Sequence, residues 1–201
     1  MDLGLKVAEV VETSSSEFLA QCYELDGAPA LGSMVRTKGK DCEIYGIVCA
    51  SATHSVEPGR RIMARGQGAQ SETDVFKANP QLAKLLCSDF RALVVGHGRG
   101  RSMYQYLPPS PASIYAFVYT CKSEEVRDFT KSLNFLSLLI DTRLPVATDE
   151  VIAAFLRLAS QTQQEPQDFL VKAGKDLAWL LSNDIRRLDS ILKRLRNDRE
   201  E

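Results

Sequence analysis

Short β-favouring runs separated by turn-forming residues fill the first third of the chain, and this feature constrains the fold most. Four such runs, V-A-E-V-V, F-L-A-Q-C, M-V-R-T and I-Y-G-I-V-C, occupy residues 7–11, 18–22, 34–37 and 44–49. Clusters of Ser, Gly, Pro, Asp and Lys lie between them. Strands this short with such closely spaced turn signals are typical of a small barrel or sandwich.

Two further strands are expected later in the chain. Residues 90–96 contain the apolar run A-L-V-V, which is typical of a buried strand. The Pro-rich residues 108–111 are extended, because each proline fixes φ and disfavours the α conformation at the residue before it. They lead into residues 114–119, I-Y-A-F-V-Y, which we expect to form the last strand of the barrel.

After Cys121 the apolar period changes from 2 to 3.6, which predicts helices. One is expected over residues 126–140, a second from Thr148, and a third from Pro166 to about Asn197. The third would be about 45 Å long and would project beyond the barrel. Its apolar stripe could support a coiled coil or a long bundle helix, and comprises Leu170, Ala173, Leu177, Leu181, Asp184, Leu188, Ile191 and Leu195. Its charged end, residues 185–201, is interpreted as a solvated face with a fraying tail, and the alternative is partner binding or self-association.

These patterns predict an α+β fold with two parts. Residues 1–123 are expected to form a small β-barrel domain, and residues 124–201 an all-helical C-terminal domain with a long terminal helix. A chain of 201 residues is long enough to bury the core of a barrel together with a helical annex.

Charge and composition indicate which partners and which cellular compartment suit this chain. With 25 Lys and Arg against 26 Asp and Glu, the net charge of −1 gives no global attraction to nucleic acid or anionic membranes. No apolar run approaches the roughly 20 residues that span a bilayer, and the N-terminus lacks the pattern of a signal peptide. We expect a soluble protein of the cytoplasm or an equivalent reducing compartment, with its five cysteines present as packed thiols rather than disulfides.

No catalytic constellation stands out. The two histidines, His54 and His97, belong to no C-x-x-C or H-x-x-x-H pattern, so neither a zinc site nor another metal site is expected. Cys22 or Cys49 could act as a nucleophile only if the fold brought a histidine close, and a buried thiol is the favoured interpretation. The G-H-G-R-G-R stretch at 96–101 lacks the spacing of a phosphate loop and is interpreted as a mobile basic loop. No catalytic residue and no cofactor are predicted.

Candidate partner-binding residues come from basic clusters and one tryptophan. The first basic cluster, Arg60, Arg61 and Arg65, is expected at one edge of the barrel. A second basic neighbourhood contains Arg91, Arg99 and Arg101. Trp179 lies beside the leucine stripe, where it either anchors a contact or caps the packing of its helix. The candidate residues are Arg60, Arg61, Arg65, Trp179, Arg186 and Arg187.

Several motifs of the first 120 residues resemble a known barrel. They are E-F at 17–18, G-S-M-V-R at 32–36, I-Y-G-I-V at 44–48, E-P-G-R-R at 57–61, N-P-Q-L at 79–82, F-R-A-L-V-V-G at 90–96 and P-P-S-P-A-S-I-Y at 108–115. Together they resemble the HAS barrel, the N-terminal barrel of HerA-type DNA-translocating ATPases and of ATP synthase subunits. In HerA-type proteins a RecA-like ATPase follows the barrel, whereas here a helical pattern follows it.

The resemblance implies a docking role, because in this family the barrel forms the collar of a ring ATPase and contacts neighbouring subunits or a nuclease. We therefore expect a non-catalytic adaptor or assembly factor that docks on a ring ATPase or an ATP-synthase-like complex. The alternative is a nucleic-acid-associated accessory factor that works through the basic edge. The Arg-Arg after Pro-Gly belongs to the shared barrel pattern, so it adds little support for DNA contact. A small enzyme with a cysteine nucleophile ranks last.

Overall fold

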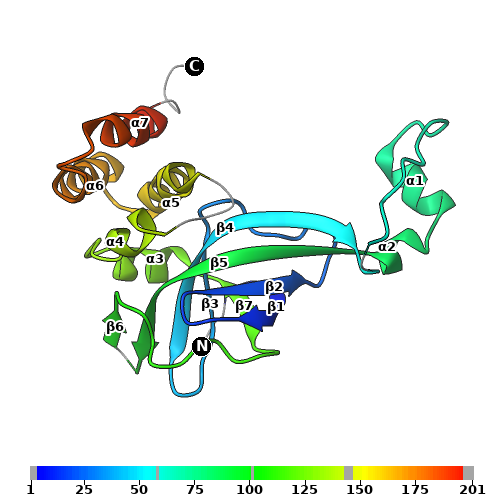
Figure 1. Ribbon diagram of the computed structural model, residues 1–201, viewed down its shortest axis with the longest axis horizontal. Coiled ribbons are helices and arrows are strands. Elements are labelled where there is room, and N and C mark those ends of the chain that lie inside the picture. Colours follow the sequence, from blue (N-terminus) through cyan, green and yellow to red (C-terminus); the bar gives the residue numbers. More distant parts are fainter. Residues whose placement is uncertain (1–3, 58, 101, 143–146, 197–201) are drawn as a thin grey trace.

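The first part of the chain forms a closed β-barrel (Figure 1). The computed structural model describes residues 4–57, 59–100, 102–142 and 147–196. Six antiparallel strands follow one another in the order β2-β1-β7-β3-β4-β5, and pairing of β2 with β5 closes the ring. Their bounds are β1 Lys6–Thr13, β2 Glu17–Cys22, β3 Met34–Lys38, β4 Glu43–Ser55, β5 Leu86–Arg99 and β7 Phe117–Thr120. The predicted small barrel is therefore confirmed.

The strand bounds agree with the sequence pattern in the first three strands and differ in the others. β4 and β5 are longer than the runs at 44–49 and 90–96, and they continue as a two-stranded ribbon. The last barrel strand begins at Phe117 rather than at residue 114, because Tyr115 adopts a positive φ of 62° that belongs to a turn. A short strand, β6 (Ser102–Tyr104), extends the sheet beyond β5 as a hairpin outside the ring.

Alternate residues of the barrel strands face two separate apolar cores. The barrel interior buries Ala8, Val10, Phe18, Ala20, Val35, Ile44, Val48, Phe90, Ala92, Val94, Ala112 and Val118. The outward residues Met34, Tyr45, Ile47, Cys49, Leu93 and Val95 join a second core that is shared with the helices. Both faces of β4 and β5 are thus covered here, which explains why their sequences are nearly continuous apolar runs rather than alternating ones.

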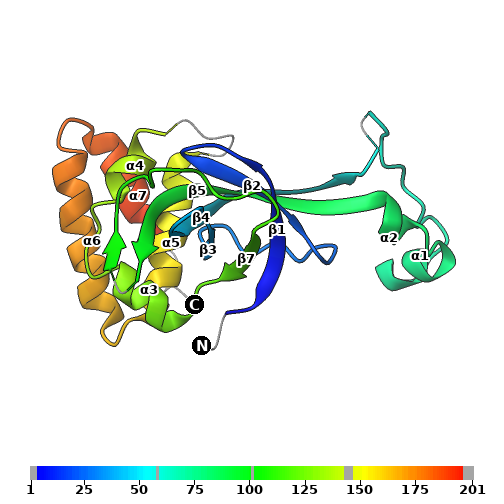
Figure 2. The same cartoon turned by 90° about the horizontal axis from the view of Figure 1, so that it is seen from below.

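The helices cover one side of the barrel (Figures 1 and 2). Their bounds are α3 Ser123–Phe129, α4 Leu136–Ile140, α5 Thr148–Thr162, α6 Pro166–Leu180 and α7 Ile185–Arg196. Helix α5 is the central one, with every residue from Val151 to Leu156 buried. The helical part therefore packs against the barrel through one continuous core.

The prediction of a single terminal helix from Pro166 to about Asn197 is wrong, because this part of the chain forms two helices, α6 and α7. Helix α6 ends at Leu180 and a new helix, α7, begins at Ile185. Asn197 lies outside the described residues. Asp184 was counted in the apolar stripe, but its carboxylate accepts a hydrogen bond from the Arg187 backbone N–H at 3.1 Å, as an N-cap does. The break lets α7 fold back, and it packs on α5 with Ile191 fully buried.

The helix expected over 126–140 is likewise divided into α3 and α4. Thr130 ends α3, and its hydroxyl donates a hydrogen bond to the Val126 carbonyl at 2.7 Å. Phe129, Leu133, Phe135 and Leu136 all remain buried across the break, so the apolar pattern reflected burial rather than one continuous helix. Among the described residues, no helix combines the length and apolar character needed to cross a membrane.

Candidate interaction surfaces

The most exposed part of the molecule is an arm, residues 56–85, which connects β4 to β5 and projects away from the barrel (Figures 1 and 2). It contains two short helices, α1 (Glu72–Ala78) and α2 (Leu82–Leu85). At its base the Val56 N–H donates a hydrogen bond to the Leu85 carbonyl at 2.9 Å, directly after the last β4–β5 pair. The arm therefore begins where the ribbon ends.

The direction of the arm follows from the shape of the β4–β5 ribbon. The pairing runs from Glu43↔Gly98 in the barrel to Ser55↔Leu86 at the base of the arm. Its register shifts twice, between Tyr45 and Gly46 and again before Ala50. Such β-bulges bend and twist a strand pair, which lets one end close the barrel while the other leaves it.

The arm has no apolar core of its own. None of its described residues is buried, in contrast to β4 and β5 on the barrel side. Four large apolar side chains are instead exposed to solvent: Val56 (53%), Ile62 (51%), Met63 (74%) and Phe76 (39%). Exposed apolar side chains gathered on one projecting element are typical of a protein–protein contact.

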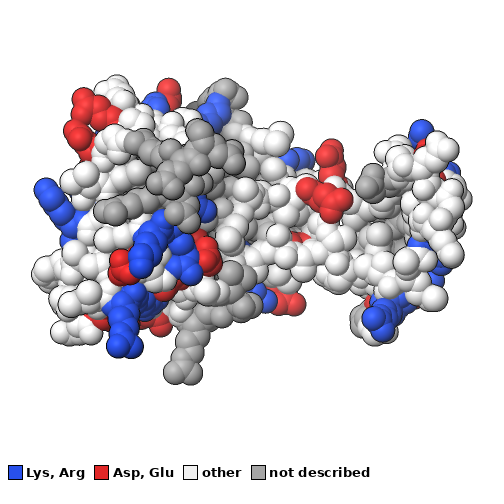
Figure 3. Space-filling view, turned by 90° about the horizontal axis from the view of Figure 1, so that it is seen from above, with Lys and Arg blue, Asp and Glu red and all other residues white. Residues whose placement is uncertain are grey.

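The arm also carries the first basic cluster, which was expected at the barrel edge. Arg60, Arg61 and Arg65 lie beyond the ribbon, because the barrel strand ends at Ser55. Figure 3 shows the arm as a lobe separated from the body of the molecule, with Lys and Arg on its surface. Arg60 forms an exposed ion pair with Glu57 at 2.9 Å, whereas no ion pair is seen for Arg61 or Arg65 within the described part of the chain.

Trp179 forms a second exposed apolar feature, on α6. Its side chain is 79% exposed, so it does not cap the packing of its helix. Helix α6 lies at the end of the molecule opposite to the arm (Figures 1 and 2). The structure therefore places two exposed apolar groups, one on the arm and one on α6, at opposite ends of the molecule.

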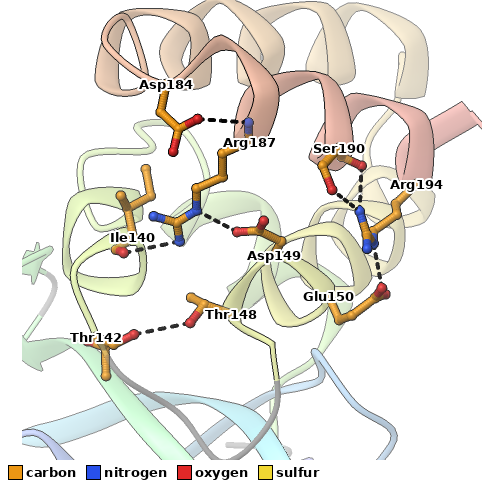
Figure 4. Close-up of polar contacts among 9 residues, drawn as sticks. All are labelled: Ile140, Thr142, Thr148, Asp149, Glu150, Asp184, Arg187, Ser190 and Arg194. Carbon is orange, nitrogen blue, oxygen red and sulfur yellow. Dashed lines mark hydrogen bonds and ion pairs between the residues drawn. The ribbon is translucent and has the colours of Figure 1, made fainter.

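The two C-terminal arginines differ in their surroundings. Arg186 is exposed, whereas Arg187 points towards α5 (Figure 4). The Arg187 guanidinium lies 2.7 Å from the Asp149 carboxylate and donates a hydrogen bond to the Ile140 carbonyl at 3.1 Å. Arg194, about two helical turns further on, pairs with Glu150 in the same way. These contacts hold α7 on the first turn of α5.

Residues 96–99 of the Gly-Arg stretch form the end of strand β5 and pair with β6, so this part is a strand and not the expected mobile loop. It borders an open hollow of about 740 Å³ whose wall carries both charge signs: Lys38, Lys40 and Arg99 against Asp41, Glu43 and Asp128. His97 is buried against the rings of Tyr104 and Tyr106 and lies within 3.2 Å of the Tyr106 carbonyl. This histidine is thus part of a packed aromatic cluster, and Arg101 lies outside the described residues.

All five cysteines are free thiols. Burial raises the pKa of each of them, to about 11 for Cys22 and Cys49. A thiol with a raised pKa is protonated at neutral pH and is a weak nucleophile. Burial thus shifts the pKa of the candidate nucleophiles Cys22 and Cys49 away from the lowered range of an activated cysteine, and the nearby Arg91 does not offset this shift at Cys49.

Sequence reasoning missed one polar cluster, at the base of the arm. His54 on β4 faces Cys87 on β5, and Asp89 lies beside them. The first two residues are 33 positions apart and share no short motif, so only the strand register brings them together. This cluster is the one place among the described residues where histidine, cysteine and carboxylate side chains could share a metal ion.

No family model matches the chain, and no curated protein matches it either. The likeness to the HAS barrel therefore rests on the motifs quoted above, with the closed barrel as the part that the structure supports.

Proposed function

We propose that this protein is a non-catalytic adaptor that attaches to a larger protein complex through its arm. The observation that carries the proposal is a projection, residues 56–57 and 59–85, in which no side chain of known exposure is fully buried while Ile62, Met63 and Phe76 are exposed. Fixing a chain segment costs conformational entropy, on the order of 1–2 kcal/mol per residue. A segment without a core recovers that free energy by burying its apolar side chains against a partner.

The form of the arm suits insertion into a groove. Its tip presents aliphatic, thioether and aromatic side chains beside exposed guanidinium groups, a combination that is enriched at the centres of protein interfaces. Arg61 and Arg65 would pair with carboxylates at the rim of such a groove. We therefore expect a partner surface that is apolar in the middle and acidic at its edges.

A second contact through Trp179 makes the molecule bivalent. The indole on α6 and the tip of the arm lie at opposite ends of the molecule, so two partners or two subunits could bind without colliding (Figure 1). Two contacts carried by one molecule raise its apparent affinity for a complex that offers both binding sites well above that of either contact alone. An adaptor or assembly factor needs this arrangement, whereas an enzyme does not.

The resemblance to the HAS barrel directs the choice of partner. We propose a multi-subunit ring ATPase or an ATP-synthase-like complex, on which this barrel would take a place next to the collar. The helical part, which follows the barrel at the place where HerA-type proteins carry an ATPase domain, would leave the ring's own motor domains to hydrolyse ATP.

The test is a comparison of the full-length chain with an arm-deleted variant, in which an Asn-Gly turn replaces residues 57–84. Asn-Gly suits a two-residue hairpin, so the β4–β5 ribbon stays closed. Each protein is used to capture partners from native extract, and light scattering then gives the mass of the recovered complex. Recovery of one ring-forming ATPase by the full-length chain alone supports the proposal. Recovery that is independent of the arm argues against it.

The alternative of a nucleic-acid-associated accessory factor has one specific observation in its favour, the exposed Arg61 and Arg65 on a projecting arm. Phosphate contacts make such binding strongly salt-dependent. The double variant Arg61→Ala/Arg65→Ala would lose DNA affinity and show a shallower salt dependence if this alternative holds. If the full-length chain has no measurable affinity for DNA at low salt, this alternative is excluded.

A further inference from the structure

Three metal-ligating side chains converge on the outer face of the ribbon at the base of the arm. His54 on β4 and Cys87 on β5 are direct cross-strand partners, and Asp89 follows two residues later on the same face of β5. The ligand atoms of the three residues, one nitrogen, one sulfur and one oxygen, all lie within 4.8 Å of one another. The cluster lies immediately before residue 56, where the arm begins.

The geometry around His54 differs from that of a catalytic triad. A triad uses both ring nitrogens, one towards the nucleophile and the other towards the carboxylate. Here the Cys87 sulfur and the Asp89 carboxylate both approach the same nitrogen, Nε2, each at 3.5 Å. The three ligand atoms therefore lie close together, all within 4.8 Å of one another, rather than in the chain of contacts that a triad needs.

The separations agree with a tetrahedral site. Bond lengths of about 2.3 Å to sulfur, 2.0–2.1 Å to nitrogen and 2.0–2.2 Å to oxygen place tetrahedral ligands about 3.4–3.6 Å apart. The observed sulfur–nitrogen and nitrogen–oxygen separations are both 3.5 Å. Only the sulfur–oxygen pair, at no more than 4.8 Å, needs to close by a small side-chain rotation.

A second observation concerns the Asp89 carboxylate. Asp89 is 8% exposed; its oxygen Oδ2 lies 3.5 Å from His54 Nε2, and the other oxygen, Oδ1, is buried without a hydrogen-bond partner among the described residues. An unsatisfied buried carboxylate oxygen costs on the order of 1–3 kcal/mol, or more when it is charged. The side chain of His54, in contrast, is 52% exposed, which leaves a route from solvent to the cluster.

We propose that Cys87, His54 and Asp89 bind one divalent transition-metal ion, of which Zn²⁺ is the best match. Thiolate and imidazole ligands favour Zn²⁺ and similar ions over Mg²⁺ and Ca²⁺, which prefer oxygen alone. On binding, the sulfur forms a bond to the metal and the thiol proton passes to solvent. The fourth ligand is either a water molecule or the side-chain amide of Gln21, which faces Asp89 from β2.

The metal would fix the orientation of the arm. A bond from His54 and a bond from Cys87 to one ion join the two strands at the point where they separate into the arm. Such a cross-link closes the intervening loop and restricts its unfolded states. The metal site itself does not depend on the proposed adaptor function, because it rests on the three side chains alone.

The test is a titration of the full-length, metal-free protein with Co²⁺, followed by displacement with Zn²⁺. We expect one ion per chain, a thiolate-to-Co²⁺ charge-transfer band, and the d–d intensity of a tetrahedral site. Cys87→Ser should abolish the charge-transfer band, and His54→Ala should weaken binding at least 10-fold. The matched control is Cys42→Ser, which removes a thiol on the β3–β4 hairpin and should change nothing.

A band that persists in Cys87→Ser, or the absence of any charge-transfer band in the wild-type protein, overturns the proposal. The second outcome would leave the cluster as an ion pair of His54 and Asp89 next to a thiol. Because the wild-type result decides by itself, the test holds even if a variant fails to fold. Loss of partner capture with retention of Co²⁺ binding would disprove the adaptor function and leave the metal site intact.

Discussion

Arg36 on β3 and Glu125 in the first turn of α3 form an ion pair across the junction between barrel and helices, with 2.9 Å between the guanidinium Nε and a carboxylate oxygen. The same guanidinium contacts Glu43 on β4 at 2.9 Å and lies over the ring of Tyr119. Glu125 also accepts a hydrogen bond from the Lys122 backbone N–H, which caps α3. One carboxylate thus orients the first helix and attaches it to the barrel.

We predict that Glu125→Gln lowers the free energy of unfolding by about 1–2 kcal/mol, because Arg36 is nearly buried and loses one of its two carboxylates. Glutamine keeps the helix cap, so Glu125→Ala should cost about 1 kcal/mol more. Urea unfolding measures both values. The exposed neighbour Glu124→Gln is the control and should cost less than about 0.5 kcal/mol. Equal effects of the two Gln variants would refute the role of the ion pair.

Gly32 brings the loop before β3 into contact with α5. Its φ is +82°, and a Cβ at this position would lie 2.4 Å from the Phe155 backbone nitrogen. We predict that Gly32→Ala destabilises the protein by about 3 kcal/mol or more, from backbone strain and from separation of the loop and the helix. Gly100→Ala shares the positive φ of +64° but meets no atom within 4 Å, so it should cost only about 1 kcal/mol. The difference in thermal stability between the two variants measures the steric clash with α5 separately from the backbone strain that both share.

Removal of the arm should leave the fold intact. Because no described residue between 56 and 85 is buried, the Asn-Gly replacement of residues 57–84 should change the free energy of unfolding by less than about 1 kcal/mol. For the same reason, trypsin should cut the wild-type chain first at Arg60, Arg61 or Arg65 and leave the barrel with its helices resistant. Unfolding of the deletion variant would show that the arm supports the core. Early cleavage elsewhere would show that the arm is not the segment that opens most readily.

Alkaline pH should destabilise the protein through its buried thiols. Burial raises the pKa of Cys49 to about 11, from an ordinary value of 9.0. Between pH 9 and 11 the unfolded chain therefore loses this proton while the folded chain keeps it, so stability falls as pH rises through this window. Cys49→Ala should show a shallower decline in urea unfolding measured at pH 8.5 and 10.5. An identical slope in both proteins would contradict the raised pKa.

The barrel was predictable because its signals are local. In β4 and β5 the residues Tyr45, Ile47, Leu93 and Val95 face the helices, while their neighbours in the chain face the barrel interior. Two covered faces require apolar residues at nearly every position, and such runs are visible in a sequence. The turn residues between the first strands are equally local signals.

The path of the chain beyond the barrel was less predictable. The signal for a helix break was present in Ser182, Asn183 and Asp184, but the leucine spacing across it continued the apolar stripe. Burial imposes the same spacing on α6 and α7 as on one long helix, because both helices pack on α5. Local spacing alone therefore cannot distinguish a long helix from a helical hairpin.

The candidate sites depended on long-range geometry. Composition identified Arg60, Arg61 and Arg65, but only the length of the β4–β5 ribbon places them on an arm instead of the barrel. The exposure of Trp179 depends on which face of α6 meets the other helices. The meeting of His54 with Cys87 needs the strand register, which two β-bulges shift.

The most direct test of the adaptor proposal is photo-crosslinking from the arm itself. A photoreactive amino acid placed at Met63, which is 74% exposed, should form an adduct with a subunit of one multi-subunit complex in native extract. Excess unlabelled full-length chain should compete for the site and suppress this adduct. An equal excess of the arm-deleted variant should leave the adduct unchanged. The same group at Leu31, exposed in the loop before β3, is the control. No adduct from position 63, or the same adducts from both positions, would contradict docking through the arm.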